Sequence, residues 1–301
     1  MKRVLILGGS GFIGKVFAER CRSAEYEVII VSQLNDGKSI LNISYNYDEL
    51  SSLLKKYRFD LILFFSGNPY PEYSEDNPST DIRLTNQPLV CLLEAMKDSA
   101  SKGKIWFASS VAVYGRTKKQ PQNESDECFP LSKYAVSKLM GEEHIKYYCR
   151  TYGLRGGSFR IFSTFGQGLR RQIVFDIYQK ISKNQGTIEL FGSGKEARDI
   201  CYVDNQVDRM WHVIHHTSPE GDVFNIGSGK LTSVSELAES IVDIMEAKVK
   251  IEFTQQIRAF DGLAWVADIS RIRKIGYEKE EVLLKGLNQT IAWFNKNGED
   301  Q

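Results

Sequence analysis

A short apolar run at the start of the chain leads directly into a loop with three regularly spaced glycines. The run is Val4–Leu7, and the loop after it reads Gly8-Gly9-Ser10-Gly11-Phe12-Ile13-Gly14. A chain that leaves a strand this tightly needs positive φ angles, and a diphosphate can approach the N-terminus of the next helix only where no Cβ stands in its way. The loop therefore predicts a dinucleotide site at the end of a first strand.

The first half of the chain alternates short apolar runs with longer amphipathic stretches. Runs rich in Val, Ile and Phe indicate buried strands, which we expect at Val4–Leu7, Glu27–Val31, Leu61–Phe65, Ile105–Ala108 and Gly157–Ile161. Helical spacing predicts helices between them, at Ile13–Ser23, Tyr47–Tyr57, Asp81–Ser99 and Lys133–Tyr152. The alternation predicts an α/β fold with a doubly wound parallel sheet, a Rossmann fold.

The pattern becomes less regular after Gly166. Helices are expected near Arg171–Ser182, Asn205–His215, Val234–Ala247 and Val282–Asn295, and strands near Thr187–Phe191 and Val223–Ile226. We therefore expect two domains, a dinucleotide-binding domain over residues 1–165 and a smaller α/β substrate domain over residues 166–301.

The charge balance of the chain argues against some classes of partner. With 39 Lys+Arg against 38 Asp+Glu, the formal net charge is +1, which gives no bulk attraction to nucleic acid or to an anionic membrane. No run approaches the ~20 apolar residues of a membrane helix, and the first run is too short for a signal peptide. We expect a cytoplasmic protein. Its five cysteines lie far apart, so neither a disulfide framework nor a metal site is predicted.

The second strand ends without the acidic residue that would bind the adenosine ribose hydroxyls of NAD. The strand runs into Ser32, so a small hydroxyl stands about where a carboxylate is expected. The missing carboxylate removes a repulsion of the 2′-phosphate, which favours NADP. Lys38 is the nearest cation for that phosphate, and NADP and NAD both remain open.

A tyrosine and a lysine lie four residues apart on a predicted helix. Tyr134 and Lys138 share one face of that helix, and a neighbouring cation lowers the pKa of a phenol toward the range of an acid/base catalyst. The strand just upstream ends in Ser109-Ser110. Because the carboxyl ends of parallel strands converge on the ligand crevice of such a sheet, we expect these side chains to meet there.

Together these motifs resemble those of the extended short-chain dehydrogenases that modify nucleotide sugars, the NAD-dependent epimerase/dehydratase family. The resemblance rests on the glycine loop, on Ser109–Gly115 and on Tyr134-x-x-x-Lys138. It continues, in family order over essentially the whole chain, through Arg160–Gly166, Arg198–Asp204, Phe224–Gly229 and Ala267–Ser270.

The resemblance implies roles for the candidate site residues. Ser110 and Tyr134 would hydrogen-bond the reacting sugar oxygen, and Tyr134 would exchange a proton as hydride moves to or from the nicotinamide. Lys138 would hold the nicotinamide ribose. The further cofactor contacts implied are Ser66, Asn86 and Asn42, the last in place of an adenine-binding aspartate. The substrate contacts implied are Ser163, where many members have asparagine, and Arg198 and Arg258, which would grip the diphosphate. Family members also suggest a homodimer.

Departures from the family pattern bear on the reaction. Val111-Ala112 stand where dehydratases carry an acidic pair, so elimination and decarboxylation lose an acid/base group. The segment from Ser32 to Leu61 is short, as in the compact 4-keto-6-deoxysugar reductases. We therefore favour an NADPH-dependent 4-keto(-6-deoxy)hexose reductase over a UDP-hexose type 4-epimerase that holds NAD tightly. A third reading is a non-catalytic nucleotide-binding sensor or scaffold, and the intact Ser110, Tyr134 and Lys138 speak against it.

Overall fold

The computed structural model describes residues 1–32, 40–41, 43–68, 71–117, 119–184, 186–256 and 264–297. The chain divides into two units, and each of them is assembled from separate stretches of sequence. Unit 1 comprises residues 1–117, 124–161 and 209–225, and unit 2 comprises residues 118–123, 162–208 and 226–301. The predicted single boundary after residue 165 does not account for residues 209–225, which belong to unit 1. The assignment of cofactor and substrate to separate domains stays a prediction.

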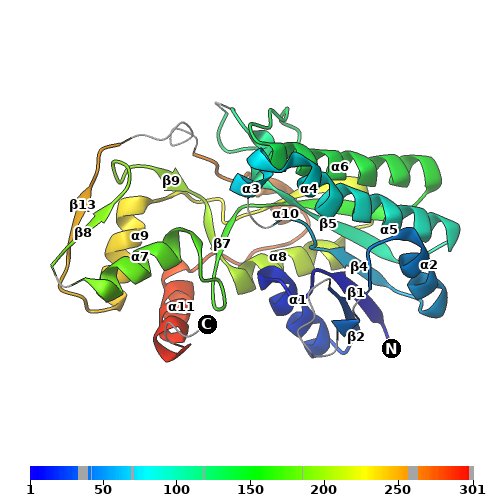
Figure 1. Ribbon diagram of the computed structural model, residues 1–301, viewed down its shortest axis with the longest axis horizontal. Helices are drawn as coiled ribbons and strands as arrows, with labels where there is room; N and C mark the ends of the chain where they lie inside the picture. Colours follow the sequence, from blue (N-terminus) through cyan, green and yellow to red (C-terminus); the bar gives the residue numbers. More distant parts are fainter. Residues whose placement is uncertain are drawn as a thin grey trace. The chain divides into compact units, whose positions relative to one another are not determined.

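Unit 1 is built on a seven-stranded sheet, and β1 (Arg3–Leu7) is one of its inner strands. The other strands are β2 (Glu27–Val31), β3 (Ile40–Leu41), β4 (Leu61–Phe64), β5 (Lys104–Ser110), β6 (Arg155–Ile161) and β11 (Glu220–Ile226). Their order is β11-β6-β5-β4-β1-β2-β3, and every pair from β6 to β3 is parallel. The chain thus winds outward from β1 in both directions and changes direction between β1 and β4 (Figure 1). This topology confirms the doubly wound fold, and the gap between these two strand ends is where such sheets bind ligands.

The helices of unit 1 follow the predicted pattern in part: the helix at Pro71–Asp76 was not predicted, and one predicted helix is wrong. They are α1 (Phe12–Ser23), α2 (Tyr47–Lys56), α3 (Pro71–Asp76), α4 (Pro78–Asp81), α5 (Gln87–Asp98) and α6 (Lys133–Tyr152). The single helix expected over Asp81–Ser99 is wrong, because a π-helical segment, Ile82–Asn86, separates α4 from α5. A π-helical turn adds a residue without changing the apolar composition, so the periodicity of the sequence does not reveal it.

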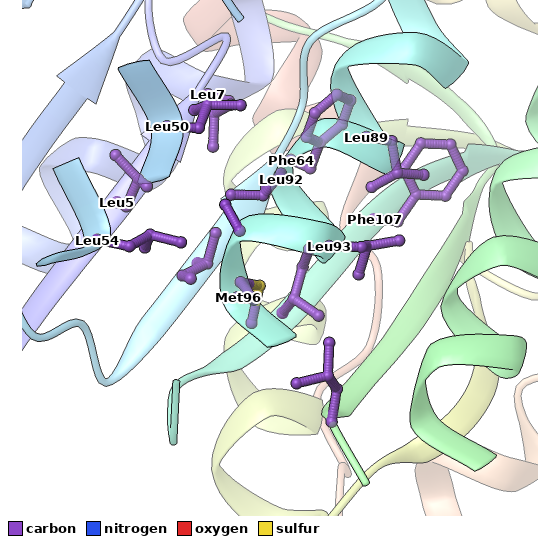
Figure 2. Close-up of a cluster of buried hydrophobic side chains, with 14 of the residues drawn as sticks. Leu5, Leu7, Leu50, Leu54, Phe64, Leu89, Leu92, Leu93, Met96 and Phe107 are labelled. Atoms are coloured by element: carbon purple, nitrogen blue, oxygen red, sulfur yellow. The ribbon is translucent and has the colours of Figure 1, made fainter. Parts of the chain in front are cut away.

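One face of the sheet packs against α2, α5 and α6 around an apolar core. Alternate side chains of β1 and β4, such as Leu5, Leu7 and Phe64, point to this face. Figure 2 shows them beside Leu50 and Leu54 of α2, and beside four side chains of α5, Leu89, Leu92, Leu93 and Met96. The spacing of these four residues places them on one side of the helix, which is why α5 lies flat on the strands.

The opposite face of the sheet packs against α1 and against residues returned late in the sequence. Trp106 of β5 stacks on Phe159 at a centroid distance of 4.4 Å and contacts Phe224 of β11 at 6.0 Å. Phe17 of α1 packs on Trp211 at 6.1 Å, and Lys104 donates hydrogen bonds to two carbonyls of the same returning segment. Residues 209–225 therefore complete the core of unit 1.

Unit 2 combines helices with short paired strands. Its helices are α7 (Gln172–Lys183), α9 (Val234–Ile244), α10 (Ser270–Lys274) and α11 (Leu283–Asn297), and α8 (Val203–His216) begins in unit 2 and ends in unit 1. Its strand pairs are β7 (Ser163–Phe165) with β10 (Ile200–Tyr202), β9 (Ala197–Arg198) with β12 (Thr232–Ser233), and β8 (Thr187–Leu190) with β13 (Lys250–Phe253). Of these strands only β8 was predicted. In the described part of the chain, no helix is long and apolar enough to cross a membrane.

Candidate active site

The glycine loop joins β1 to α1 at the carboxyl edge of the sheet in unit 1. Gly8 has φ +79°, and a Cβ on it would lie 2.6 Å from the Ser66 amide nitrogen. A Cβ on Gly14 would lie 2.4 Å from the Gly8 carbonyl oxygen. These two positions therefore tolerate no side chain. Helix α1 begins at Phe12 with Gly11 as N-cap and no side-chain cap, so the first turn, with Ile13, presents amide N–H groups that suit a diphosphate.

The end of β2 contributes a hydroxyl to the same loop. Ser32 is 3% exposed, and its Oγ lies 2.8 Å from Ser10 Oγ. No carboxylate stands at the position of Ser32 itself. Asn42 and Lys38, which the sequence analysis places near the adenosine half of the cofactor, lie outside the described residues.

The loop after β4 connects the glycine loop to Lys138. Ser66 lies beside Gly8, as the 2.6 Å approach above shows, and Gly67 follows with φ +146°. A Cβ on Gly67 would lie 2.8 Å from Thr85 Oγ1 and 3.4 Å from Lys138 Nζ. The ends of β1 and β4 thus converge with α6 at one edge, as predicted for a ligand crevice.

The serine strand β5 ends at Ser110, where a single turn of 3₁₀ helix, Val111–Tyr114, begins. The Ser110 hydroxyl caps that turn by accepting from the Ala112 amide at 3.2 Å. The side chain is held in place and is still partly exposed. At Val111 and Ala112 the turn carries no carboxyl group for elimination chemistry.

Helix α6 starts one residue before Tyr134, and two serines secure its first turn. Ser132 accepts from the Ala135 amide at 3.1 Å, which is the N-cap bond. Ser74 of α3 accepts from the Tyr134 amide at 3.1 Å. The predicted bounds of this helix, 133–152, agree with the observed ones. The two hydrogen bonds hold its first turn in place, and Tyr134 and Lys138 lie on one side of the helix.

Lys138 is the buried cation of the site. It is 5% exposed, and its Nζ donates to the Ala108 carbonyl at 2.9 Å. The same nitrogen lies 5.1 Å from the centroid of the Phe107 ring and 5.6 Å from that of Tyr134. Burial lowers the pKa of Lys138 to about 8, while the charge of Asp81 opposes that change. An ammonium beside a phenol stabilises the phenolate, so this pairing suits Tyr134 to acid/base chemistry.

Asn86 lies against the same stretch of α6. Its side chain donates to the Ser137 carbonyl at 2.9 Å and accepts from the Ser137 hydroxyl at 2.6 Å. Both hydrogen bonds are buried, and they hold Ser137, the residue directly before Lys138. In this structure Asn86 thus supports α6, and a direct contact with the cofactor stays a prediction.

A buried ionic network behind Ser110 escaped the sequence analysis. Glu142 is fully buried and accepts from Ser109 Oγ at 2.5 Å. It also accepts from Arg160 of β6, at 3.0 Å from Nε and 2.8 Å from Nη2. Because Glu142 follows Lys138 by four residues, the helical spacing that joined Tyr134 and Lys138 could have revealed it. The network ties α6 to the end of the serine strand.

The predicted substrate residues belong to unit 2. Ser163 starts β7 and lines a cavity of about 20 Å³, which is room for a single water and not for a nucleotide. Arg198 is exposed, and within the described residues its guanidinium has no hydrogen bond or ion pair. The adjacent Asp199 is committed elsewhere, accepting from the amides of Ser228, Gly229 and Ala267. Arg258 lies outside the described residues.

The fold and the arrangement of these side chains define a Rossmann-fold enzyme with a nicotinamide dinucleotide as cofactor. A model of the NAD dependent epimerase/dehydratase family matches residues 4–227, and the chain belongs to this family. The predictions of an enzyme and of this family are confirmed. The relatives that resemble the chain include proteins named as nucleotide-sugar epimerases, dehydratases and reductases.

Some relatives that resemble the chain along its whole length are named as epimerases, and others are named as reductases. A protein of Methanocaldococcus jannaschii named putative UDP-glucose 4-epimerase is 27% identical, over 98% of this chain and 99% of its own. The dTDP-4-dehydro-6-deoxyglucose reductase of Escherichia coli is 26% identical, over 96% of each chain. The solved UDP-N-acetylglucosamine 4-epimerase from Methanobrevibacter ruminantium M1, in complex with UDP-N-acetylmuramic acid, aligns with a TM-score of 0.88 at 25% identity, covering 99% of each chain.

Proposed function

We propose that the protein moves a hydride at a carbon of a nucleotide-activated hexose, as an NADPH-dependent 4-keto(-6-deoxy)hexose reductase. The observation that carries the reaction type is the buried ammonium of Lys138, 5.6 Å from the Tyr134 ring, at the edge where the glycine loop and Ser110 also lie. The nicotinamide, when bound, supplies or accepts the hydride.

The residues of unit 1 divide the remaining work. Ser110 and Tyr134 hold the sugar oxygen by hydrogen bonds, and Tyr134 Oη donates the proton that this oxygen gains on reduction. Lys138 stabilises the phenolate that is left. The glycine loop, with Gly8 and Gly14 bare of side chains, holds the diphosphate of the cofactor against the N-terminus of α1.

The choice of a reductase over an epimerase is inferred from the adenosine half of the site. An epimerase regenerates its cofactor within each turnover, whereas a reductase must exchange it. The hydroxyl pair of Ser32 and Ser10 replaces a ribose-binding carboxylate, which favours a looser site that accepts a 2′-phosphate.

Replacing Ser32 with Asp should reverse the cofactor preference from NADPH to NADH. The added carboxylate repels the 2′-phosphate and can accept hydrogen bonds from the free hydroxyls of NAD. Steady-state kcat/KM for each cofactor measures the effect. The Ser32→Asn variant is the control, since it has similar bulk and no charge, and it should not reverse the preference. A Ser32→Asp enzyme that still prefers NADPH would remove Ser32 from cofactor selection.

A 4-epimerase is the second candidate, and the names of the relatives support it. One experiment separates the two. The purified protein is denatured, and the released nucleotide is identified and counted. The reductase should release little, whereas stoichiometric NAD, with interconversion of 4-epimers in the absence of added cofactor, would establish the epimerase instead.

Replacing Arg198 with Lys should weaken substrate binding and leave cofactor affinity nearly unchanged. Lysine keeps the positive charge but loses the planar fork that binds a diphosphate through two hydrogen bonds. Calorimetric titrations with a nucleotide sugar and with the cofactor measure the two affinities. Lys195→Arg, on an exposed neighbour, should change neither. Equal weakening of both ligands by Arg198→Lys would indicate a structural role.

We also propose a cytoplasmic homodimer. The support in the structure is a stripe of exposed apolar side chains along α6, with Val136 44% exposed, Met140 39% and Tyr147 44%. These residues recur at helical spacing on one side, where the exposed Glu143 lies between Met140 and Tyr147, and exposed apolar side chains that gather on one face favour association.

A further inference from the structure

Asp81 has the least expected surroundings of the carboxylates near the site. Its side chain is 1% exposed, and neither carboxylate oxygen has a hydrogen-bond partner among the described residues. Taking an ionised carboxylate out of water without a partner is costly, so native proteins provide a compensating charge.

A π-helical segment begins directly after this side chain. Asp81 immediately precedes Ile82–Asn86, where the Gln87 amide donates to the Ile82 carbonyl in the i to i+5 pattern of a π-helix. Asp81 and Asn86, at the two ends of this stretch, are both buried, while Ile82 is exposed. Asn86 is the residue hydrogen-bonded to Ser137 of α6.

Asp81 lies where two segments that pack against the helix of Lys138 meet. Both α4 and the π-helical segment pack against α6, and Thr85 and Lys138 flank Gly67 together. No hydrogen bond among the described residues joins Asp81 to Lys138, and their attraction acts through space, where the burial of both residues leaves it weakly screened. Within the described residues, Lys138 has no salt bridge that would supply the missing charge.

We propose that Asp81 is a positioning residue, the buried counter-ion that holds Lys138 as an ammonium beside Tyr134. The catalytic consequence of this role rests on the proposed function, whereas the charge interaction between Asp81 and Lys138 does not. Among the described residues, the charged or titratable groups close to Lys138 in sequence or on the segments packed against α6 include Tyr134; Glu142, already paired with Arg160; and the exposed Lys133, Arg83, Glu75 and Asp76.

The test is the titration of Lys138 itself. Protein with ¹³C,¹⁵N-labelled lysine is titrated from pH 6 to 11 by NMR, with the Lys138 signal assigned from its loss in Lys138→Met. In Asp81→Asn the midpoint should fall by about one pH unit, since a nearby opposite charge typically shifts a pKa by 1–3 units. Asp76→Asn, the same change at an exposed position of α3, should leave it in place. An unchanged midpoint in folded Asp81→Asn overturns the proposal.

A second measurement needs no variant. The Asp81 carboxyl carbon of ¹³C-aspartate-labelled wild-type protein should show an ionised group at pH 7, and a protonated one would overturn the proposal even if Asp81→Asn failed to fold.

The catalytic consequence has its own signature in the pH profile. The alkaline limb of kcat/KM should move down in Asp81→Asn together with the Lys138 midpoint, because loss of the ammonium leaves the Tyr134 phenolate unsupported. Asp81→Glu, which keeps the charge, should restore it. A purely structural residue would lower the plateau and leave the limb in place. If the proposed reaction itself fails, the NMR midpoints still answer the question.

Discussion

Replacement of Tyr134 with Phe should lower kcat by about 10²-fold or more, the usual scale of general acid–base catalysis. Only the phenolic oxygen is lost, and the ring can keep its place near Lys138 Nζ. Cofactor affinity should therefore persist, and kcat and kcat/KM should fall together. Steady-state kinetics on a 4-keto sugar nucleotide, with cofactor binding followed by fluorescence, measure the two quantities.

Tyr147→Phe provides the matched control for this experiment. Tyr147 lies on the same helix, is 44% exposed, and its hydroxyl contacts that of Tyr152 at 3.4 Å. Its loss should leave turnover near the wild-type value. If Tyr134→Phe turned over its true substrate at the wild-type rate, another group would have to deliver the proton.

Replacement of Glu142 with Ala should destabilise unit 1 by about 3–5 kcal/mol, the scale for removing one partner of a buried ion pair. The side chains of Glu142 and Arg160 are 0% and 3% exposed, so the variant leaves the guanidinium uncompensated in the interior. Alanine favours helix formation, which excludes helix propensity as the cause. Urea unfolding followed by circular dichroism measures the free energy.

The neighbouring Glu143 is the control, because its pair with Lys146 is exposed and Glu143→Ala should cost less than about 1 kcal/mol. The double variant Glu142→Met, Arg160→Met should recover much of the loss, since it leaves no charge without a partner. A small effect of Glu142→Ala would mean that water reaches Arg160.

The parts of the fold that local patterns determine were predicted well. The five strands from β1 to β6 that carry apolar runs, and α6 with its serine N-cap, were located from residue type and spacing. Apart from β8, the short strands of unit 2 were missed because two to four residues carry too little pattern, and their pairing depends on tertiary contacts. The π-helical segment was missed because its composition is that of an ordinary helix.

The candidate site also contains residues that were predicted from the sequence and residues that were not. The glycine loop, Ser110, Tyr134 and Lys138 were proposed from motifs whose chemistry is visible in the residue types. Asp81 was not, since a carboxylate in an amphipathic stretch is expected to face solvent, whereas this one is buried. Glu142 could have been found from its helical spacing to Lys138, but it was not predicted.

The return of residues 209–225 to unit 1 has a consequence for how the protein forms during its synthesis. Trp106 and Phe17 gain Phe224 and Trp211 as partners only from that late segment. While the ribosome has released only the first half of the chain, one face of the nascent sheet therefore stays without its cover. The whole of residues 162–208 must therefore emerge before the first unit can close, so part of the second unit is already synthesised when the first is completed.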